Sequence, residues 1–142
     1  MAIRKANAEW NGDLKSGKGN MALESGAWQG AYSFDSRFEE GTGSNPEELI
    51  AAAHAGCFSM ALSNILAEAG FAPESVRTEA RVHLEFGDDG PAIPRIELSC
   101  LARVPGLSDG DFQTHAKAAK EGCPVSKVLA GARIELSAKL ES

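Results

Sequence analysis

The spacing of hydrophobic and polar positions predicts short strands at the start of the chain and a second hairpin near its middle. Residues 3–33 alternate loosely and contain Asn11-Gly12, a pair typical of hairpins, so about three antiparallel strands are expected there. Residues 81–86 and 96–104 alternate strictly on either side of a turn over 87–90. This pattern predicts a second hairpin.

The longest apolar stretch lies between these hairpins and has helix signals at both ends. Asn45 is a candidate N-cap, Pro46 suits the first helical position, and Glu48 completes a capping-box pattern. Gly70 is expected to end the helix. The residues between are almost all small or apolar, so we expect this helix to be buried nearly all round.

A helix with a polar outer face is expected from a cap at Ser108 or Asp109 to Gly122, followed by a short segment over 123–129 and a strand over 132–140. The order is strands, helix, strands, helices, strand, without repeated βαβ units. It predicts an α+β fold in which an antiparallel sheet is wrapped around a long, buried central helix.

The composition predicts one domain over residues 1–142, since 43% of the residues are hydrophobic and 24% are charged. The formal net charge of -6 argues against nucleic acid or an anionic membrane as a partner and favours a small molecule or a protein. We expect no apolar run long enough to span a bilayer. No apolar segment follows Arg4 and Lys5, so a cytoplasmic location is expected.

The three cysteines differ in their surroundings. Three widely spaced cysteines cannot all pair, which points to chemistry or to plain burial. Cys100 lies in phase with the inner face of a predicted strand, so it is expected in the core. Cys123 follows Gly122 and precedes Pro124, which predicts an N-cap position where backbone N–H groups favour a thiolate.

Cys57 lies in the middle of the predicted helix, where burial alone would raise its pKa and leave it inert. It therefore needs a cation. The candidate is Arg37, in a polar loop expected over residues 35–44, and a buried arginine needs an acid. Glu47 is the preferred anchor, because Glu48 is assigned to the cap. Taken singly, Arg37 would be expected as a solvated loop charge and Glu47 as a favourable acid in the first helical turn.

Three segments together resemble the osmotically inducible protein C (OsmC) family, closest to its OsmC branch: Asn45-Pro46-Glu47-Glu48-Leu49, Ala52-Ala53-His54-Ala55-Gly56-Cys57-Phe58-Ser59-Met60-Ala61-Leu62 and Gly122-Cys123-Pro124-Val125-Ser126. The likeness extends over essentially the whole chain. It implies an intertwined α+β homodimer with active sites at the subunit interface. It also implies a thiol-dependent peroxidase acting on organic hydroperoxides and hydrogen peroxide, without a cofactor. The residues that it implies for catalysis are Cys57, Cys123, Arg37 and Glu47.

Peroxide reduction requires a thiolate, which Arg37 could stabilise while it orients the peroxide. The product would be a sulfenic acid at Cys57, which Cys123 would convert to a disulfide before over-oxidation. An external dithiol must then reduce the disulfide, and the resemblance suggests one of lipoyl type. Phe38, Phe58 and Met60 could line the entrance for an alkyl hydroperoxide.

Ten residues separate Glu47 from Cys57, which is about 15 Å along a helix and about 80° around it, so the two cannot meet in one straight helix. Either Arg37 bridges part of this distance or the acid comes from an antiparallel helix of a second chain. We favour the second chain, since an almost wholly apolar helix needs more cover than one small domain offers.

Two other functions remain open. A zinc site could use a tetrahedral set of His54, Cys57, His115 and Cys123, although neither pair has the spacing of a zinc finger. On the peroxidase hypothesis, His54 is instead a hydrogen-bonded core or interface residue, and His83 and His115 lie at the surface. The third hypothesis is a non-catalytic dimer that binds apolar ligands.

Overall fold

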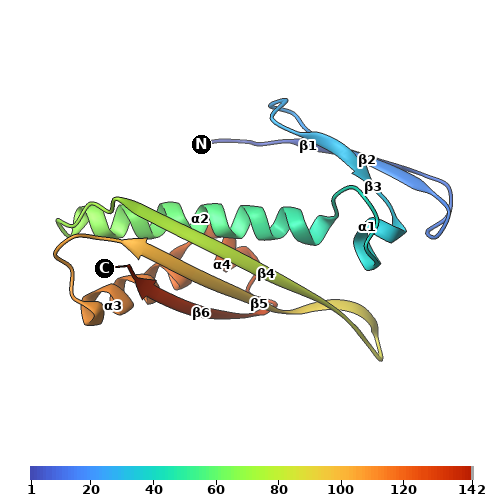
Figure 1. Ribbon diagram of the computed structural model, residues 1–142. Helices are drawn as coiled ribbons and strands as arrows, with labels where there is room; N and C mark the ends of the chain where they lie inside the picture. The colour runs from blue at the N-terminus through green and yellow to red at the C-terminus, as the bar shows by residue number, and fades with distance from the viewer. Residues whose placement is uncertain (142) are drawn as a thin grey trace. The chain divides into compact units, whose positions relative to one another are not determined.

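A computed structural model of the chain describes residues 1–141 (Figure 1). It divides into two compact units, Met1–Leu49 and the part that begins at Ile50. The two units are described separately below.

The first unit contains a small antiparallel sheet and a short helix. Its strands are β1 (Ala6–Asn11), β2 (Lys18–Leu23) and β3 (Gln29–Tyr32), in the order β1-β2-β3. The expectation of three antiparallel strands is confirmed. A helix, α1 (Phe34–Phe38), replaces part of the loop expected over 35–44.

Helix α2 (Pro46–Glu68) begins in the first unit and continues in the second. Oδ1 of Asn45 accepts a hydrogen bond of 2.7 Å from the backbone N–H of Glu48, which confirms the N-cap. The Glu48 carboxylate does not complete the capping box on Asn45. It accepts a 2.7 Å hydrogen bond from the hydroxyl of Ser44 instead.

The C-terminal end of α2 also follows the sequence signal. Gly70 has φ of +91°, a conformation that favours glycine. The N–H of Phe71 then donates to the carbonyl of Leu66 at 2.9 Å, as in a Schellman cap. The predicted end of the helix is confirmed.

The second unit contains strands β4 (Ser75–Gly87), β5 (Gly90–Arg103) and β6 (Arg133–Leu140), in the order β4-β5-β6. Strands β4 and β5 form the expected antiparallel hairpin, but β6 pairs with β5 in parallel. The expectation of a wholly antiparallel sheet was therefore wrong. Helices α3 (Asp109–Gly122) and α4 (Pro124–Val128) lie between β5 and β6, and a crossover of this length allows a parallel return. The fold class is α+β, as expected.

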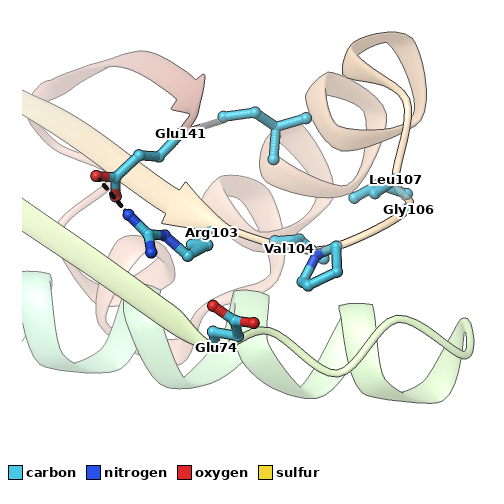
Figure 2. A pocket seen from close by; sticks show the side chains of 8 residues that line it. Glu74, Arg103, Val104, Gly106, Leu107 and Glu141 are labelled. Carbon is cyan, nitrogen blue, oxygen red and sulfur yellow. Dashed lines mark hydrogen bonds and ion pairs between the residues drawn. The ribbon is translucent and has the colours of Figure 1, made fainter.

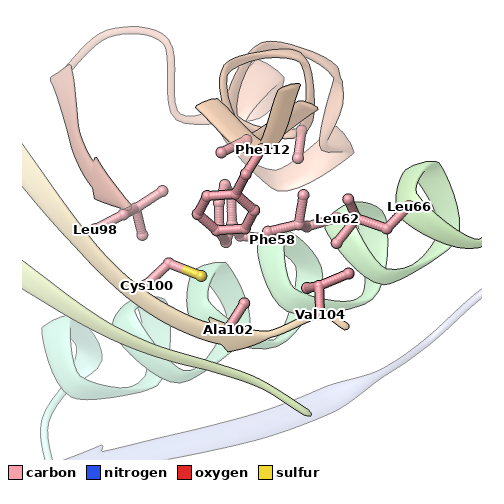
Figure 3. Packing of buried hydrophobic residues seen from close by; sticks show 10 residues of the cluster. Phe58, Leu62, Leu66, Leu98, Cys100, Ala102, Val104 and Phe112 are labelled. Carbon is pink, nitrogen blue, oxygen red and sulfur yellow. The ribbon is translucent and has the colours of Figure 1, made fainter. Parts of the chain in front are cut away.

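The core of the second unit lies between α2, α3 and one face of β5 (Figure 3). Alternate residues of β5 point into it, because successive side chains of a strand face opposite sides. Its fully or almost fully buried members are Phe58, Leu62, Leu66, Leu98, Cys100, Ala102, Val104, Phe112, Ala116 and Ala119. Cys100 is thus a core residue, as expected.

Within one chain, α2 is buried on one side only, so burial nearly all round stays a prediction that depends on cover from a second chain. Its buried residues in the second unit recur every four positions at His54, Phe58, Leu62 and Leu66, so they form one stripe. On other sides, small and apolar residues are exposed, and Met60 is 76% exposed. By length and composition alone, α2 is also apolar enough to cross a membrane, contrary to our expectation that no run would be. The core helix of a globular protein can have the same composition.

Candidate active site

Two cysteines that are 66 positions apart in the sequence meet in the second unit. Cys57 lies in the middle of α2, and Cys123 lies between two helices. The N–H of Cys123 donates to the carbonyl of Ala119 at the end of α3, and Pro124 then begins α4, so the predicted N-cap position is confirmed. The two Sγ atoms lie 2.6 Å apart, and both cysteines are free thiols. Either thiol can donate in this contact.

The two thiols differ in accessibility. Cys57 is partly exposed, whereas Cys123 is fully buried, with 0% exposure. A small molecule that approaches from solvent therefore reaches Cys57 before Cys123.

The thiols also differ in the direction of their pKa shifts. Burial, followed by the hydrogen bond with Cys123, raises the pKa of Cys57. At Cys123, burial alone would raise the pKa, but hydrogen bonds from Cys57 and Ser126 outweigh it and lower the pKa. The Cys123 side chain makes no capping hydrogen bond to α4, although the backbone N–H groups of Val125 and Ser126 also lower the pKa of Cys123. Within the second unit, the thiolate is thus favoured on Cys123.

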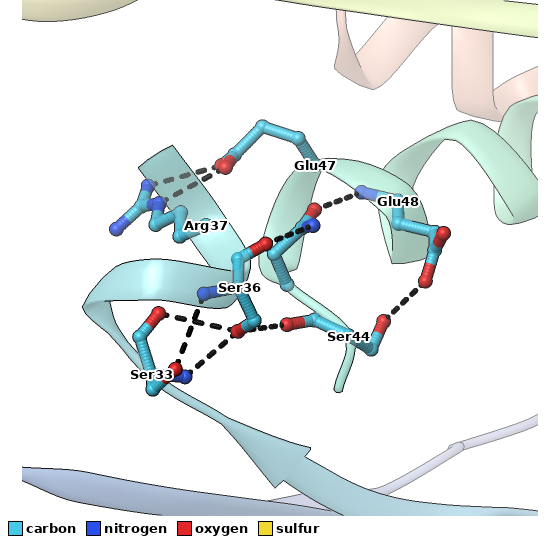
Figure 4. A network of polar contacts seen from close by, with 7 residues as sticks. Ser33, Ser36, Arg37, Ser44, Glu47 and Glu48 are labelled. Atoms are coloured by element: carbon cyan, nitrogen blue, oxygen red, sulfur yellow. Dashed lines mark hydrogen bonds and ion pairs between the residues drawn. The ribbon is translucent and has the colours of Figure 1, made fainter. Parts of the chain in front are cut away.

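Arg37 and Glu47 form a two-pronged ion pair in the first unit (Figure 4). Nε of Arg37 donates to one carboxylate oxygen of Glu47 at 2.9 Å, and Nη2 donates to the other at 3.0 Å. The Glu47 side chain is 9% exposed and the Arg37 side chain 34%. The guanidinium also lies 5.2 Å from the ring centre of Phe38. Arg37 is therefore fixed in direction but still open to a small ligand.

A set of hydrogen bonds between α1 and the start of α2 fixes this ion pair (Figure 4). The hydroxyl of buried Ser36 donates to the carbonyl of Ser44 at 2.7 Å. The side-chain amide of Asn45 donates to the carbonyl of Ser36 at 3.0 Å. Ser33 caps α1, since its hydroxyl accepts from the N–H of Ser36 at 3.1 Å. The helix that presents Arg37 is therefore tied to the helix that presents Glu47.

The structure thus brings the four candidate residues together as two pairs, Arg37 with Glu47 and Cys57 with Cys123. The Arg37–Glu47 pair forms within one chain. Each pair belongs to a different unit, so the action of Arg37 on Cys57 stays a prediction.

A cavity of about 390 Å³ in the first unit includes Arg37 and Phe38 among its lining residues. Its other lining residues are Trp10, Gly12, Leu14, Tyr32, Ser33 and Phe34. Phe58, one of the three residues that could line an entrance, is instead fully buried as a core residue. A larger cavity of about 520 Å³ lies at the end of β5, beside the Arg103–Glu141 ion pair (Figure 2). No cysteine lines it.

His54 is fully buried and hydrogen-bonded, as expected. Its Nε2 lies 2.7 Å from the hydroxyl oxygen of Ser126, a residue that sequence reasoning missed. Within residues 1–141, no three cysteine, histidine or acidic side chains converge as a metal would require. His83 pairs with Glu97 at 2.5 Å and is only partly exposed.

The sequence of this chain resembles those of known proteins. Residues 39–138 match the family of OsmC-like proteins. Peroxiredoxin OsmC of Escherichia coli strain K12 is 51% identical to this chain over 140 residues, which cover 98% of the chain and 97% of that protein. The organic hydroperoxide resistance protein OhrB of Bacillus subtilis strain 168 is 33% identical over 90 residues, or 63% of the chain and 65% of that protein.

Solved structures show the same fold. The crystal structure of OhrB has a TM-score of 0.69 at 24% identity and covers 96% of this chain and 98% of its own. An OsmC-like protein from Mycoplasma pneumoniae has a TM-score of 0.75 at 15% identity, with 99% of each chain covered. At these identities, the structural likeness concerns the fold alone.

Proposed function

Because this chain belongs to the family of OsmC-like proteins, we propose that its peroxidase reaction takes place at the Cys57–Cys123 pair. The chain is an oxidoreductase that reduces peroxides, and organic hydroperoxides and hydrogen peroxide are the proposed substrates. The observation that best supports this site is the contact of 2.6 Å between two free thiols of different exposure.

In the first step, the Cys57 thiolate attacks one peroxide oxygen. An S–O bond forms, the O–O bond breaks, and the leaving oxygen departs as an alkoxide that takes up a proton. Because burial raises the pKa of Cys57, the step needs a cation, and no lysine or arginine is among the groups that shift that pKa. Arg37, fixed by Glu47, would stabilise this thiolate and the departing oxygen, from its own chain or from a second copy. The aromatic cavity beside Arg37 would accommodate the alkyl group.

In the second step, the Cys123 thiolate attacks the sulfur of the Cys57 sulfenic acid. An S–S bond forms, the S–O bond breaks, and hydroxide leaves as water after it takes up a proton. Cys123 is already in contact with Cys57, so no large movement is needed before over-oxidation to the sulfinic acid.

An external dithiol would then restore both thiols by attack on the disulfide, and its own two sulfurs would be oxidised to a disulfide. We propose a dithiol of lipoyl type, as the resemblance suggests. Because Cys57 is the more exposed residue, its sulfur is the proposed point of attack.

The exposed apolar side of α2 is the basis for a proposed homodimer. Met60 is 76% exposed, together with small neighbours such as Gly56 and Ala53. A second copy of the chain would cover this side. Sedimentation or size-exclusion mass at low concentration tests the proposal, and a stable, active monomer would overturn it.

Hydroperoxide consumption tests the proposed reaction. A small alkyl hydroperoxide is supplied with dihydrolipoamide or, separately, with thioredoxin as electron donor. Turnover is expected with dihydrolipoamide for the unaltered protein and for Cys100→Ser, but not for Cys57→Ser. Full turnover by Cys57→Ser would overturn the proposed site, whereas turnover with thioredoxin alone would overturn only the proposed reductant.

A further inference from the structure

Two pairs of side chains face each other where α2 meets α4. His54 and Cys57 are three positions apart on α2, and Cys123 and Ser126 are separated by the same spacing at the start of α4. Cys57 contacts Cys123, and His54 contacts Ser126 at 2.7 Å. Both His54 and Ser126 are buried, at 0% and 4% exposure. A buried polar contact, between His54 and Ser126, thus lies beside the thiol contact, and the proposed reaction does not use it.

Ser126 lies three residues after Cys123 at the start of α4, and its side chain lowers the pKa of the Cys123 thiol, so one hydroxyl contacts His54 and also acts on the buried thiol. A serine hydroxyl has one donor and two acceptor positions. If the hydroxyl donates to Cys123, its oxygen remains free to accept from His54. The order of donation is then from His54 to Ser126 and from Ser126 to Cys123.

The surroundings of the other ring nitrogen favour this order. Nδ1 of His54 is buried and has no hydrogen-bond partner among residues 1–141. A buried N–H without an acceptor is rarer and more costly than a buried acceptor without a donor. The proton is therefore assigned to Nε2, where it can be donated to Ser126. Burial lowers the pKa of His54, so the ring is neutral at neutral pH.

We propose that His54 and Ser126 are positioning residues for Cys123, and that they form a buried relay that keeps a hydroxyl hydrogen directed at the Cys123 sulfur. This inference rests on the proposed function and deepens it. The relay stabilises Cys123 as a thiolate when it attacks the sulfenic acid. It stabilises the same thiolate again when a dithiol attacks the Cys57 sulfur and the S–S bond breaks, with the electron pair left on Cys123.

The relay also explains how the two sulfurs differ in the groups that stabilise them as thiolates. The Cys57 sulfur is partly exposed and is proposed to depend on a guanidinium, whereas the buried Cys123 sulfur has a neutral hydrogen-bond donor instead. A neutral donor stabilises a thiolate inside a protein without adding a buried charge that needs its own partner. A leaving thiolate of lower pKa also departs faster in thiol–disulfide exchange.

The proposal is tested by titration of Cys123 without peroxide or reductant. Cys57→Ser/Cys100→Ser leaves Cys123 as the single thiol, and ultraviolet absorbance of the thiolate is followed against pH. Three titratable groups, Lys120 and Glu121 of α3 and Lys127 of α4, line a pocket with Ser126 and stay unchanged in all variants.

In this background, Ser126→Ala is expected to raise the pKa of Cys123 by about one unit, since a hydrogen bond to a charged group is lost. His54→Phe is expected to raise it by a smaller amount. Ser126→Thr and His54→Gln retain the donors and should return the titration toward that of the parent. Ser59→Ala is the matched control, because it removes a partly buried hydroxyl of α2 that pairs with Thr78 at 2.7 Å.

In the protein with all three cysteines, Ser126→Ala should also slow reduction of the preformed Cys57–Cys123 disulfide by dihydrolipoamide about threefold. Equal Cys123 titration curves for Ser126→Ala, His54→Phe and Ser59→Ala would overturn the relay. Because this titration involves no peroxide, the relay and the peroxidase reaction can fail separately. If Ser126→Ala does not fold, His54→Phe and its His54→Gln counterpart make the same test.

Discussion

The two units of the chain differ in the chemical groups that they bury. In the first unit, a charged guanidinium is fixed by a carboxylate that is almost fully buried, and the surrounding contacts are polar hydrogen bonds of α1 and the start of α2. In the second unit, two thiols lie beside an apolar core, and their nearest partners are each other and Ser126. The first unit contains a fixed guanidinium but no cysteine. The second unit contains both thiols, and no lysine or arginine is among the groups that shift the pKa of Cys57.

On the proposed mechanism, this difference means that neither region alone is sufficient for peroxide reduction. The second unit alone raises the pKa of Cys57, so its more accessible sulfur would stay protonated near neutral pH. The first unit alone offers an oriented charge and an aromatic cavity but no cysteine. The predictions below separate the contributions of the two units.

The largest effect is expected from exchange of the two sulfurs in turn. Cys57→Ser should abolish oxidation by peroxide altogether, because the attacking atom is lost. Cys123→Ser should still react once with peroxide but should not turn over through a Cys57–Cys123 disulfide. Its Cys57 should become over-oxidised. Mass spectrometry of each protein after peroxide treatment checks both outcomes. Equal behaviour of the two variants would contradict their separate roles.

The next largest effect is expected at Arg37. Arg37→Ala should slow oxidation of Cys57 by about 100-fold, the size usual for loss of one donor that stabilises charge in a transition state. Stopped-flow oxidation under single-turnover conditions measures this rate. Arg81→Ala is a suitable control, since Arg81 is an exposed arginine paired with Glu79. An unchanged rate of Cys57 oxidation in Arg37→Ala would mean that the first unit has no part in the mechanism.

The pH dependence of the rate of Cys57 oxidation also separates the contributions of the two units. Burial raises the pKa of Cys57, so without a cation the thiolate fraction falls tenfold for each pH unit below that pKa. The rate for Arg37→Ala should therefore rise steadily from neutral to alkaline pH, whereas the rate of the unaltered protein should be nearly constant there. Glu47→Gln should lie between the two, about tenfold below the unaltered protein at neutral pH. Parallel profiles for all three proteins would argue that Arg37 does not ionise Cys57.

The smallest effects are expected from loss of the N-caps of α2 and α3. Asn45→Ala removes the N-cap of α2. Ser108→Ala removes the N-cap of α3, where the Ser108 hydroxyl accepts from the N–H of Asp111 at 3.2 Å. Each should lower the free energy of unfolding by about 1 kcal/mol. Asn45→Ala should additionally reduce activity, because the Asn45 amide also donates to Ser36 beside Arg37. Denaturant unfolding and the peroxidase assay together check this difference.

Features encoded by neighbouring residues could be predicted from the sequence. The caps at Asn45 and Gly70 follow from local chemistry, as does the N-cap position of Cys123 between Gly122 and Pro124. The two hairpins follow from alternation and turn residues. The Arg37–Glu47 contact could be proposed only because one buried charge requires another.

Features that depend on distant residues could not be predicted in the same way. The parallel pairing of β6 depends on the path of α3 and α4, which strand alternation does not specify. The contact between His54 and Ser126 joins residues 72 positions apart, and neither residue has a local signal for it. The apolar length of α2 suggested burial on all sides, although one chain covers only a single stripe.

The central claim is most directly tested by the mass of the protein after one equivalent of alkyl hydroperoxide without reductant. The account predicts the loss of two hydrogen atoms per chain and a single cross-linked peptide that joins Cys57 to Cys123 within one chain. Unchanged thiols, or a disulfide that includes Cys100, would contradict it.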